Sequence, residues 1–236
     1  MTTRDPQAQR LARLAGLIAD ETRAACLLAL LDGRAWTAGE LARHAGVAPS
    51  TLSEHLGKLV TGGLLTEERQ GRHRYVRLAD ARVAHLVEDL AAQVPPEDAV
   101  RPRGLRASSA GSAMARGRTC YDHLAGRLGI AVTDGLTVRG LLRQGTGFAL
   151  TDAGVDWFGA AGIALAPGSR RPLARACLDW TERRPHLAGA AGAALCRHAF
   201  SVGWCVRIGT ERAVKVTDAG ERALWELLGI EPGALR

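Results

Sequence analysis

The sequence predicts a mainly α-helical fold with small β-hairpin wings, arranged in two domains. In residues 1–94, apolar side chains recur every three or four positions, as on the buried face of a helix, and give way once to strand-like alternation. Residues 95–113 are rich in Pro, Arg and Ser, which is typical of a linker. Residues 114–236 are apolar again and repeat a short strand-to-helix motif. The 236 residues suffice for two domains of ordinary size.

Three helices frame the first domain. They are expected over residues 7–19, 21–32 and 80–93, where leucine, isoleucine and valine follow the helical period. The third carries an apolar stripe from Val83 to Val94 that is wide enough to pack against a second copy of the chain. Packing within one subunit would explain the same stripe.

Residues 37–77 form one predicted unit of helix, tight turn, second helix and hairpin. Thr37 is predicted to cap the first helix, and Glu40 completes a capping box. Gly46 supplies the positive φ of the turn, and Pro49 suits the first turn of the second helix. This order of elements places one helix in the major groove of DNA and a basic hairpin beside it.

The DNA contacts are predicted on the second helix and at the hairpin tip. Leu52, Leu56 and Leu59 mark the buried face of that helix, so its hydroxyl and charged side chains remain exposed. Hydroxyls and carboxylates can read base edges, whereas Lys and Arg meet phosphates. The predicted contacts are Ser50, Thr51, Ser53, Glu54, His55 and Lys58 on the helix, and Arg69, Arg72, His73 and Arg74 at the hairpin.

Several short motifs carry a family resemblance. They are DETR at 20–23, ELA at 40–42, PSTLSEHLGKL at 49–59, GLL at 63–65 and GRHRYVRL at 71–78. With them, residues 7–94 resemble the winged helix-turn-helix transcriptional regulators of the ArsR/SmtB family, in a subgroup with a C-terminal extension. The resemblance implies a homodimeric repressor that binds double-stranded operator DNA and changes affinity when an effector binds. It also implies that the first and last helices of this region form the dimer interface.

The two metal sites common in that family are incomplete here. One uses a Cys-x-Cys pair in the helix before the turn, which here reads ELARH at 40–44 and contains no cysteine. The other uses Asp-x-His and a later His on the last helix, but Asp80 is followed by Ala81 and Arg82, and only His85 lies further on. The resemblance therefore does not make the chain an arsenic or zinc sensor by those sites.

The second domain is expected to be α+β. LTDAG at 150–154 and VTDAG at 216–220 each indicate a strand that ends at a threonine helix cap. A helix is expected over 186–200 and a hairpin over 204–216. Helix, hairpin and helix is winged-helix order, so the domain is predicted to be winged-helix-like. It lacks a hydroxyl-rich recognition turn, so an effector-sensing or dimerisation role is favoured over DNA reading.

Two cysteine and histidine pairs stand out in this domain. Cys120 and His123 lie three residues apart, which predicts one face of a helix. Cys177 and His186 form a similar pair, and HLAG begins at both histidines. Two such pairs could hold zinc or another soft metal ion in a tetrahedral site. The sequence leaves open whether the cofactor is such an ion or none.

Other interpretations of these residues and of the effector stay open. The cysteines and histidines would also suit a packed core, or a redox sensor with a low-pKa thiol. A small-molecule effector would need an apolar pocket. Four tryptophans could line it: Trp157, Trp180, Trp204 and Trp225.

Composition limits the remaining function classes. The net charge is +7, of which residues 1–94 carry +1 and residues 95–236 carry +6. The DNA-binding unit therefore has little net positive charge, and its DNA contacts depend on where its basic residues lie. Five cysteines without a dense framework favour a reducing cytoplasm. No apolar run reaches the roughly 18–20 residues of a membrane span, and the first ten residues lack the apolar core of a signal peptide.

No catalytic signature is present. The sequence contains no nucleophile elbow, phosphate loop, HExxH zinc motif or dinucleotide fingerprint. The chain is therefore expected not to be an enzyme. The alternatives are an enzyme or a protein-interaction scaffold that uses the winged helix for targeting.

Overall fold

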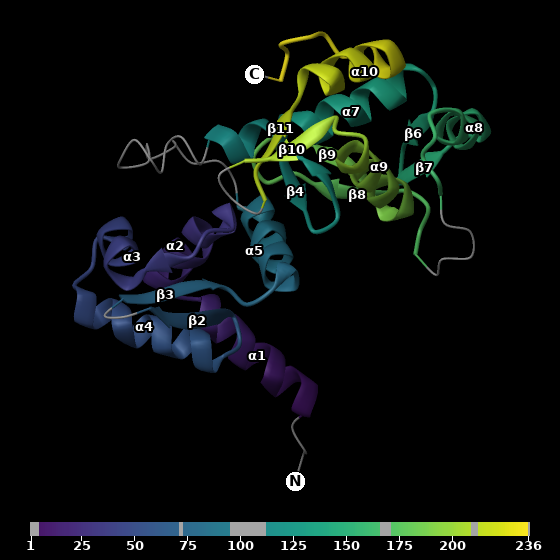
Figure 1. Ribbon diagram of the computed structural model, residues 1–236. Coiled ribbons are helices and arrows are strands. Elements are labelled where there is room, and N and C mark those ends of the chain that lie inside the picture. Colours follow the sequence, from purple (N-terminus) through teal and green to yellow (C-terminus); the bar gives the residue numbers. More distant parts are fainter. Residues whose placement is uncertain (1–4, 71–72, 95–111, 166–170, 209–211, 236) are drawn as a thin grey trace. The chain divides into compact units, whose positions relative to one another are not determined.

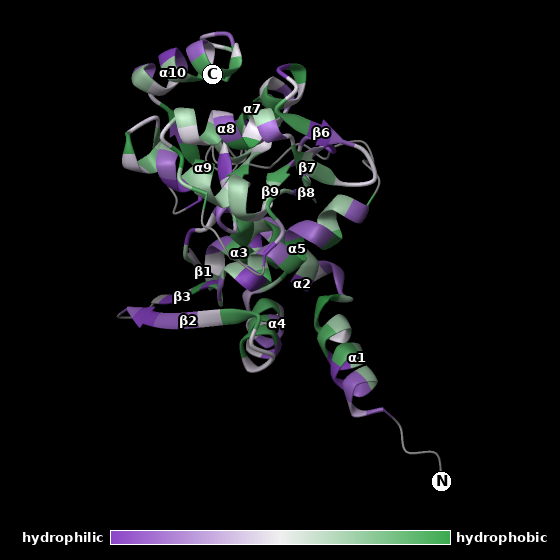
Figure 2. Ribbon diagram, turned by 90° about the vertical axis from the view of Figure 1, so that its right-hand side faces the viewer, coloured by the Kyte–Doolittle hydropathy of each residue, from purple (hydrophilic) through white to green (hydrophobic). Residues whose placement is uncertain are grey.

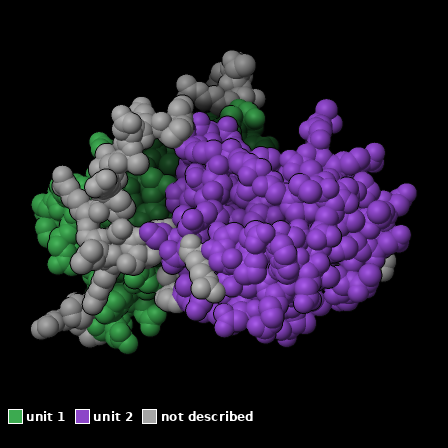
Figure 3. All heavy atoms as spheres, turned by 90° about the horizontal axis from the view of Figure 1, so that it is seen from above, with its two compact units in different colours: residues 1–87 green, residues 88–236 purple. Residues whose placement is uncertain are grey.

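The computed structural model describes residues 5–70, 73–94, 112–165, 171–208 and 212–235. The chain divides into two compact units, Met1–Val87 and Glu88–Arg236 (Figure 3). The division falls within helix α5 (Ala81–Gln93). The domain limits expected from the sequence stay a prediction, because most of the linker lies outside the described ranges.

The first unit is a winged helix-turn-helix (Figure 1). Its sheet has the antiparallel order β1-β3-β2, and β2 and β3 form the wing hairpin, with Leu65 opposite Leu78. The order of helices and hairpin predicted from the sequence is confirmed. The elements are α1 (Pro6–Ile18), α2 (Glu21–Ala29), η1 (Leu30–Asp32), β1 (Trp36–Thr37), α3 (Ala38–Ala45), α4 (Pro49–Thr61), β2 (Leu65–Gln70) and β3 (His73–Leu78).

Leucines hold α4 in place. Leu52, Leu56 and Leu59 are fully buried together with Leu41 of α3, and burying one such side chain contributes about 1.5–3 kcal/mol. The opposite side of α4 therefore faces solvent. Figure 2 shows that the wing strands are mostly hydrophilic, which fits the exposure of every residue of β2 after Leu65.

The capping box at the start of α3 is confirmed. Thr37 Oγ1 accepts from the Glu40 backbone N–H at 3.2 Å, and the Glu40 carboxylate accepts from the Thr37 N–H at 2.8 Å. Gly46 ends the helix with a φ of 68°, a conformation that favours glycine. Local chemistry therefore sets both ends of α3.

The second unit contains one series of elements twice (Figure 1). Each series, here called a repeat, consists of a hairpin, a helix, a second hairpin and a second helix. The first repeat is β4 (Arg118–Cys120), β5 (His123–Ala125), α7 (Gly126–Val138), β6 (Leu142–Gln144), β7 (Phe148–Leu150) and α8 (Asp152–Ala160). The second repeat is β8 (Arg175–Leu178), β9 (Pro185–Ala188), α9 (Gly189–Ser201), β10 (Cys205–Arg207), β11 (Val214–Val216) and α10 (Asp218–Leu228).

Two expectations about this unit were wrong. Cys120 and His123 lie on the two strands of hairpin β4–β5 and not on a helix. The helix expected from residue 186 begins only at Gly189, because 185–188 is strand β9. A three-residue spacing fits a helical face and also a hairpin with a two-residue turn. Here Tyr121, with a φ of 58°, takes part in that turn.

The threonine caps of the two repeats are confirmed. Thr151 Oγ1 accepts from the Gly154 N–H and Thr217 Oγ1 from the Gly220 N–H, both at 3.0 Å. These caps start α8 and α10. Figure 2 shows α9 as hydrophobic over most of its length, and this helix lies in the core.

Candidate DNA interface and metal centre

The first turns of α4 present the predicted base-reading side chains. Ser50, Thr51, Ser53 and Glu54 are all exposed. Ser53 Oγ donates to the Pro49 carbonyl oxygen at 2.9 Å, so it still has lone pairs free to accept. The four residues share the side of α4 opposite its buried leucines.

His55 is directed away from that exposed side. Its side chain is 16% exposed, and its Nδ1 lies 3.4 Å from Asp20 Oδ1 and 3.3 Å from Arg23 Nη1. Asp20 also caps α2 by accepting from the Arg23 N–H, which lowers the pKa of Asp20. His55 therefore links α4 to α2, in contrast to its predicted base contact.

The basic residues of the wing differ in exposure and in pairing. Arg69 is exposed on β2. Arg74 instead pairs across the hairpin with Glu67, with Nε 2.6 Å from Oε2, so its charge is balanced within the wing. Arg72 and the side chain of His73 lie outside the described residues.

A groove lies between α1 and α4. Its volume is about 850 Å³, and Lys58, Arg10 and Arg13 all line it. Lys58 was expected at the DNA backbone, whereas the two α1 arginines were not singled out from the sequence. Only the packing of α1 beside α4 brings these three cations to one groove.

Four side chains of the second unit come together as a cluster. The ligand atoms of Cys120, His123, Cys177 and His186 all lie within 4.8 Å of one another, and all four residues are buried. The two Sγ atoms are 3.9 Å apart. The two histidines face each other with their Nε2 atoms 3.1 Å apart. These are the four residues that the sequence pairs up as metal-ligand candidates.

The two repeats contribute to the cluster in the same way. Cys120 lies opposite His123 in hairpin β4–β5, and Cys177 lies opposite His186 in hairpin β8–β9. Opposite residues of an antiparallel pair point to the same face. Each hairpin thus presents one thiol and one imidazole.

Glycines let each repeat approach the histidine of the other. A Cβ at Gly129 would lie 3.6 Å from His186 Cβ, and one at Gly192 would lie 3.2 Å from His123 Cβ. Each glycine follows the histidine of its own repeat by six positions. The full repeated motif is therefore HLAGxxG, and the second glycine is the part that sequence reasoning missed.

A carboxylate lies close to the Nδ1 atom of each imidazole. His123 Nδ1 lies 3.3 Å from Asp122 Oδ1, and His186 Nδ1 lies 3.2 Å from Asp179 Oδ2. The second contact is poorly aligned for a hydrogen bond, so it is an ion contact. Burial lowers the pKa of His186, but the neighbouring Asp179 and Cys177 outweigh it and raise the pKa overall.

The pKa of Cys177 is shifted in the opposite direction from the pKa values of the other buried thiols of the unit. The contact with Cys120 lowers the pKa of Cys177 to about 2 against the effect of burial, and the two histidines add to this lowering. The contact with Cys177, burial and the Glu88 carboxylate raise the pKa of Cys120. Burial raises the pKa of both Cys196 and Cys205 to about 12. The close contact between Cys120 and Cys177 therefore distinguishes these two thiols from Cys196 and Cys205.

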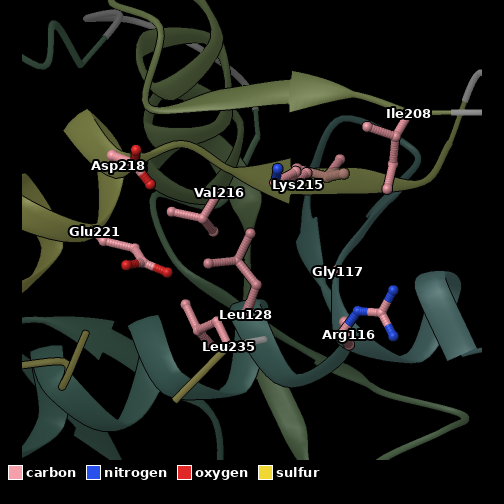
Figure 4. Close-up of a pocket in the computed structure, with 10 residues that line it drawn as sticks. Arg116, Gly117, Leu128, Ile208, Lys215, Val216, Asp218, Glu221 and Leu235 are labelled. Atoms are coloured by element: carbon pink, nitrogen blue, oxygen red, sulfur yellow. The ribbon is translucent and has the colours of Figure 1, made fainter. Parts of the chain in front are cut away.

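The second unit also contains a cavity away from the cysteine and histidine cluster (Figure 4). Its volume is about 470 Å³. Leu128, Val216 and Leu235 point toward one another on one side of it, and Asp218 and Glu221 add carboxylates. The four tryptophans that were considered for a small-molecule pocket are not among its lining residues.

Comparisons with known proteins identify the family of the chain. Residues 18–68 match the family model described as a helix-turn-helix domain. The HTH-type transcriptional regulator YdfF of Bacillus subtilis is 38% identical over 224 residues, which cover 94% of this chain and 98% of that protein. The chain belongs to the ArsR family of winged-helix transcriptional regulators. The resemblance inferred from the motifs is confirmed.

Further relatives match a smaller share of this regulator. CmtR of Mycobacterium tuberculosis (strain ATCC 25618 / H37Rv) is 35% identical over 114 residues, covering 48% of this chain and 96% of CmtR. The solved structure of the cadmium metal-sensor CMTR from Mycobacterium tuberculosis covers 40% of this chain and 96% of its own, with 38% identity and a TM-score of 0.32. Across the described part of the chain, every helix is too short or too polar to span a bilayer.

Proposed function

We propose that this regulator binds its operator as a homodimer in the cytoplasm, represses transcription, and senses an effector in its second unit. The observation that carries the proposal is the polar face of α4, where Ser50, Thr51, Ser53 and Glu54 are exposed above buried leucines. In helix-turn-helix proteins this part of the second helix meets base edges.

We expect different residues to contact the bases and the phosphates. The hydroxyls of Ser50, Thr51 and Ser53 can reach bases or phosphates, and Glu54 can accept from a cytosine amino group. Exposed Arg69 and Lys58 are suited to phosphates. Arg74 contributes less, because Glu67 already balances its charge.

A second copy of the chain is the proposed partner of α1. None of the residues of α1 is buried, and Leu11 is 66% exposed. A helix with an exposed apolar side gains stability when that side packs against a partner. Replacing Leu11 with Asp is expected to raise the monomer fraction in sedimentation velocity, whereas replacing exposed Gln9 with Asp leaves it unchanged.

Two observations support effector sensing in the second unit. The metal sites common in the family are incomplete in the first unit. The second unit has a buried cluster of potential ligands and a cavity of about 470 Å³.

A gel-shift experiment tests operator binding. Full-length protein is titrated into DNA from the promoter region of its own gene, against a scrambled fragment of equal length. Specific binding that weakens steeply with salt is expected, because phosphate contacts release counterions. Equal binding to both fragments would refute the proposal.

A further inference from the structure

We propose that Cys120, His123, Cys177 and His186 bind one thiophilic divalent cation such as Zn²⁺ in a closed tetrahedral site that joins the two repeats. The inference names the chemical class of the effector, and its regulatory part rests on the function proposed above. The binding part stands on the geometry of the cluster alone.

The distances within the cluster fit such an ion. Zn–S bonds of about 2.3 Å and Zn–N bonds of about 2.0–2.1 Å, at tetrahedral angles, place two sulfurs about 3.8 Å apart and two nitrogens about 3.3 Å apart. The Sγ atoms here are 3.9 Å apart, and the Nε2 atoms are 3.1 Å apart. The four ligands would therefore bind the ion with only small shifts.

The histidines are oriented as ligands. Both turn Nε2 inward, and each Nδ1 lies against the carboxylate of its own repeat, Asp122 or Asp179. Metal-bound histidines commonly place the second ring nitrogen on such a carboxylate, which fixes the orientation of the ring. Two core histidines held only by packing would need neither the inward pair of nitrogens nor the two carboxylates.

Charge also favours a divalent ion. Two thiolates and two neutral imidazoles around a 2+ ion give a neutral buried centre, which limits the cost of burying charge. The nearby acids have partners of their own, because Arg118 contacts both Glu88 and Asp179, and Arg212 contacts Glu88. All four ligands come from the protein and are buried, as in closed metal sites without an open coordination position.

A disulfide between Cys120 and Cys177 is the competing outcome. It would require the sulfurs to close from 3.9 Å to about 2.05 Å. That bond would use neither histidine, whereas a metal ion would use all four inward-facing side chains. The structure therefore favours a metal ion, and the experiment separates the two.

The binding test uses cobalt as a spectroscopic probe. Full-length protein, reduced and freed of metal with a chelator, is titrated with CoCl₂. One equivalent is expected to give the strong visible bands of tetrahedral Co²⁺ and a thiolate-to-cobalt charge-transfer band. C120S and C177S are each expected to lose at least roughly half of the charge-transfer intensity, since each removes one of two thiolates. C196S and C205S, which remove buried thiols outside the cluster, should match the wild type.

X-ray absorption and a check of folding show whether a negative result reflects the site or a misfolded variant. X-ray absorption of the zinc-loaded wild type should find two sulfur and two nitrogen ligands, and it needs no variant. A folded wild type, checked by circular dichroism, that gives no tetrahedral cobalt spectrum would overturn the inference. So would an unchanged spectrum in a folded C120S or C177S variant. Formation of a Cys120–Cys177 disulfide in protein that takes up no cobalt would replace the metal site with a redox one.

The regulatory part has its own readout. Operator affinity is measured with and without one equivalent of ZnCl₂, and at least a tenfold change is expected. A zinc-loaded protein with unchanged affinity would overturn the regulatory part and leave the site intact. A protein that never binds the operator would refute the proposed function, while the cobalt titration would still decide the site.

Discussion

At the scale of single residues, the buried side chain of Glu88 has polar partners that are distant in the sequence. It is 2% exposed and accepts from Arg212 Nη2 at 2.6 Å and from Trp180 Nε1 at 3.1 Å. The Cys120 thiol donates to it as well, at 3.3 Å. Nothing in the sequence marks Glu88 among the charged residues of its helix, because these partners lie between 32 and 124 positions away along the chain.

Replacing Glu88 with Ala is expected to destabilise the second unit by about 3–5 kcal/mol, because the buried Arg118 loses one of its two acidic partners and Arg212 loses its ion pair. Guanidinium unfolding followed by tryptophan fluorescence measures this, since four of the five tryptophans lie after residue 88. Exposed Gln93→Ala is the control and should change little. A loss below about 1 kcal/mol for Glu88→Ala would show that water or other groups replace the carboxylate.

At the scale of elements, the helix-turn-helix could be predicted because its signals are local. The capping box of Thr37 and Glu40, the turn at Gly46 and the leucines of α4 each act within a few residues. The hairpin β10–β11 was also predicted, but the first hairpin of each repeat, β4–β5 or β8–β9, could not be predicted in the same way. Strands β4 and β5 have three residues each, and the spacing of Cys120 and His123 fits a helix equally well.

The capping box predicts a pH dependence for α3. The backbone N–H of Thr37 lowers the pKa of Glu40 from its ordinary value of 4.5. A lowered folded pKa means that the charged carboxylate stabilises the fold above pH 4.5, and that this stabilisation is lost as the pH falls through the folded value. The stability difference between wild type and Glu40→Gln should therefore be present at neutral pH and vanish in acid, as measured by urea unfolding. A difference that does not depend on pH would contradict this cause.

Two glycines of the second unit should respond in opposite ways to alanine. A Cβ at Gly192 would lie 2.5 Å from the Leu187 carbonyl oxygen, whereas at Gly159 nothing lies within 4 Å. Gly192→Ala should lower the melting temperature and disturb the adjacent His123. Gly159→Ala should hold or raise stability by up to about 1 kcal/mol, since alanine favours helix. Thermal unfolding of both variants checks this, and a Gly192→Ala protein as stable as the wild type would contradict the close approach.

At the scale of the whole molecule, the sequence predicted the parts of the candidate metal centre but not how they meet. The motifs contain all four candidate ligands and the HLAG repeat. The duplicated arrangement that brings them together depends on contacts 57 and 63 residues apart. On the DNA-binding face, the exposure of α4 followed from its leucine period, whereas the pairing of Arg74 with Glu67 depends on strand register.

Salt dependence should separate the two kinds of contact on that face. Arg69→Ala is expected to weaken binding to all sequences alike and to reduce the slope of log K against log salt by about one. Ser53→Ala should keep the slope and relax discrimination between operator variants. Fluorescence anisotropy across a salt series measures both effects. Equal slopes for the wild type and Arg69→Ala would remove Arg69 from the interface.

We propose above all that the exposed face of α4 reads operator DNA. Its most direct test is the affinity of the full-length protein for promoter DNA and for a scrambled fragment, at one fixed salt concentration. The promoter is expected to bind at least about 10³-fold more tightly. Replacing Ser50, Thr51 and Ser53 together with alanine is expected to remove most of this preference while the protein stays folded. Equal affinities for the two fragments, or a preference that survives the triple replacement, would contradict it.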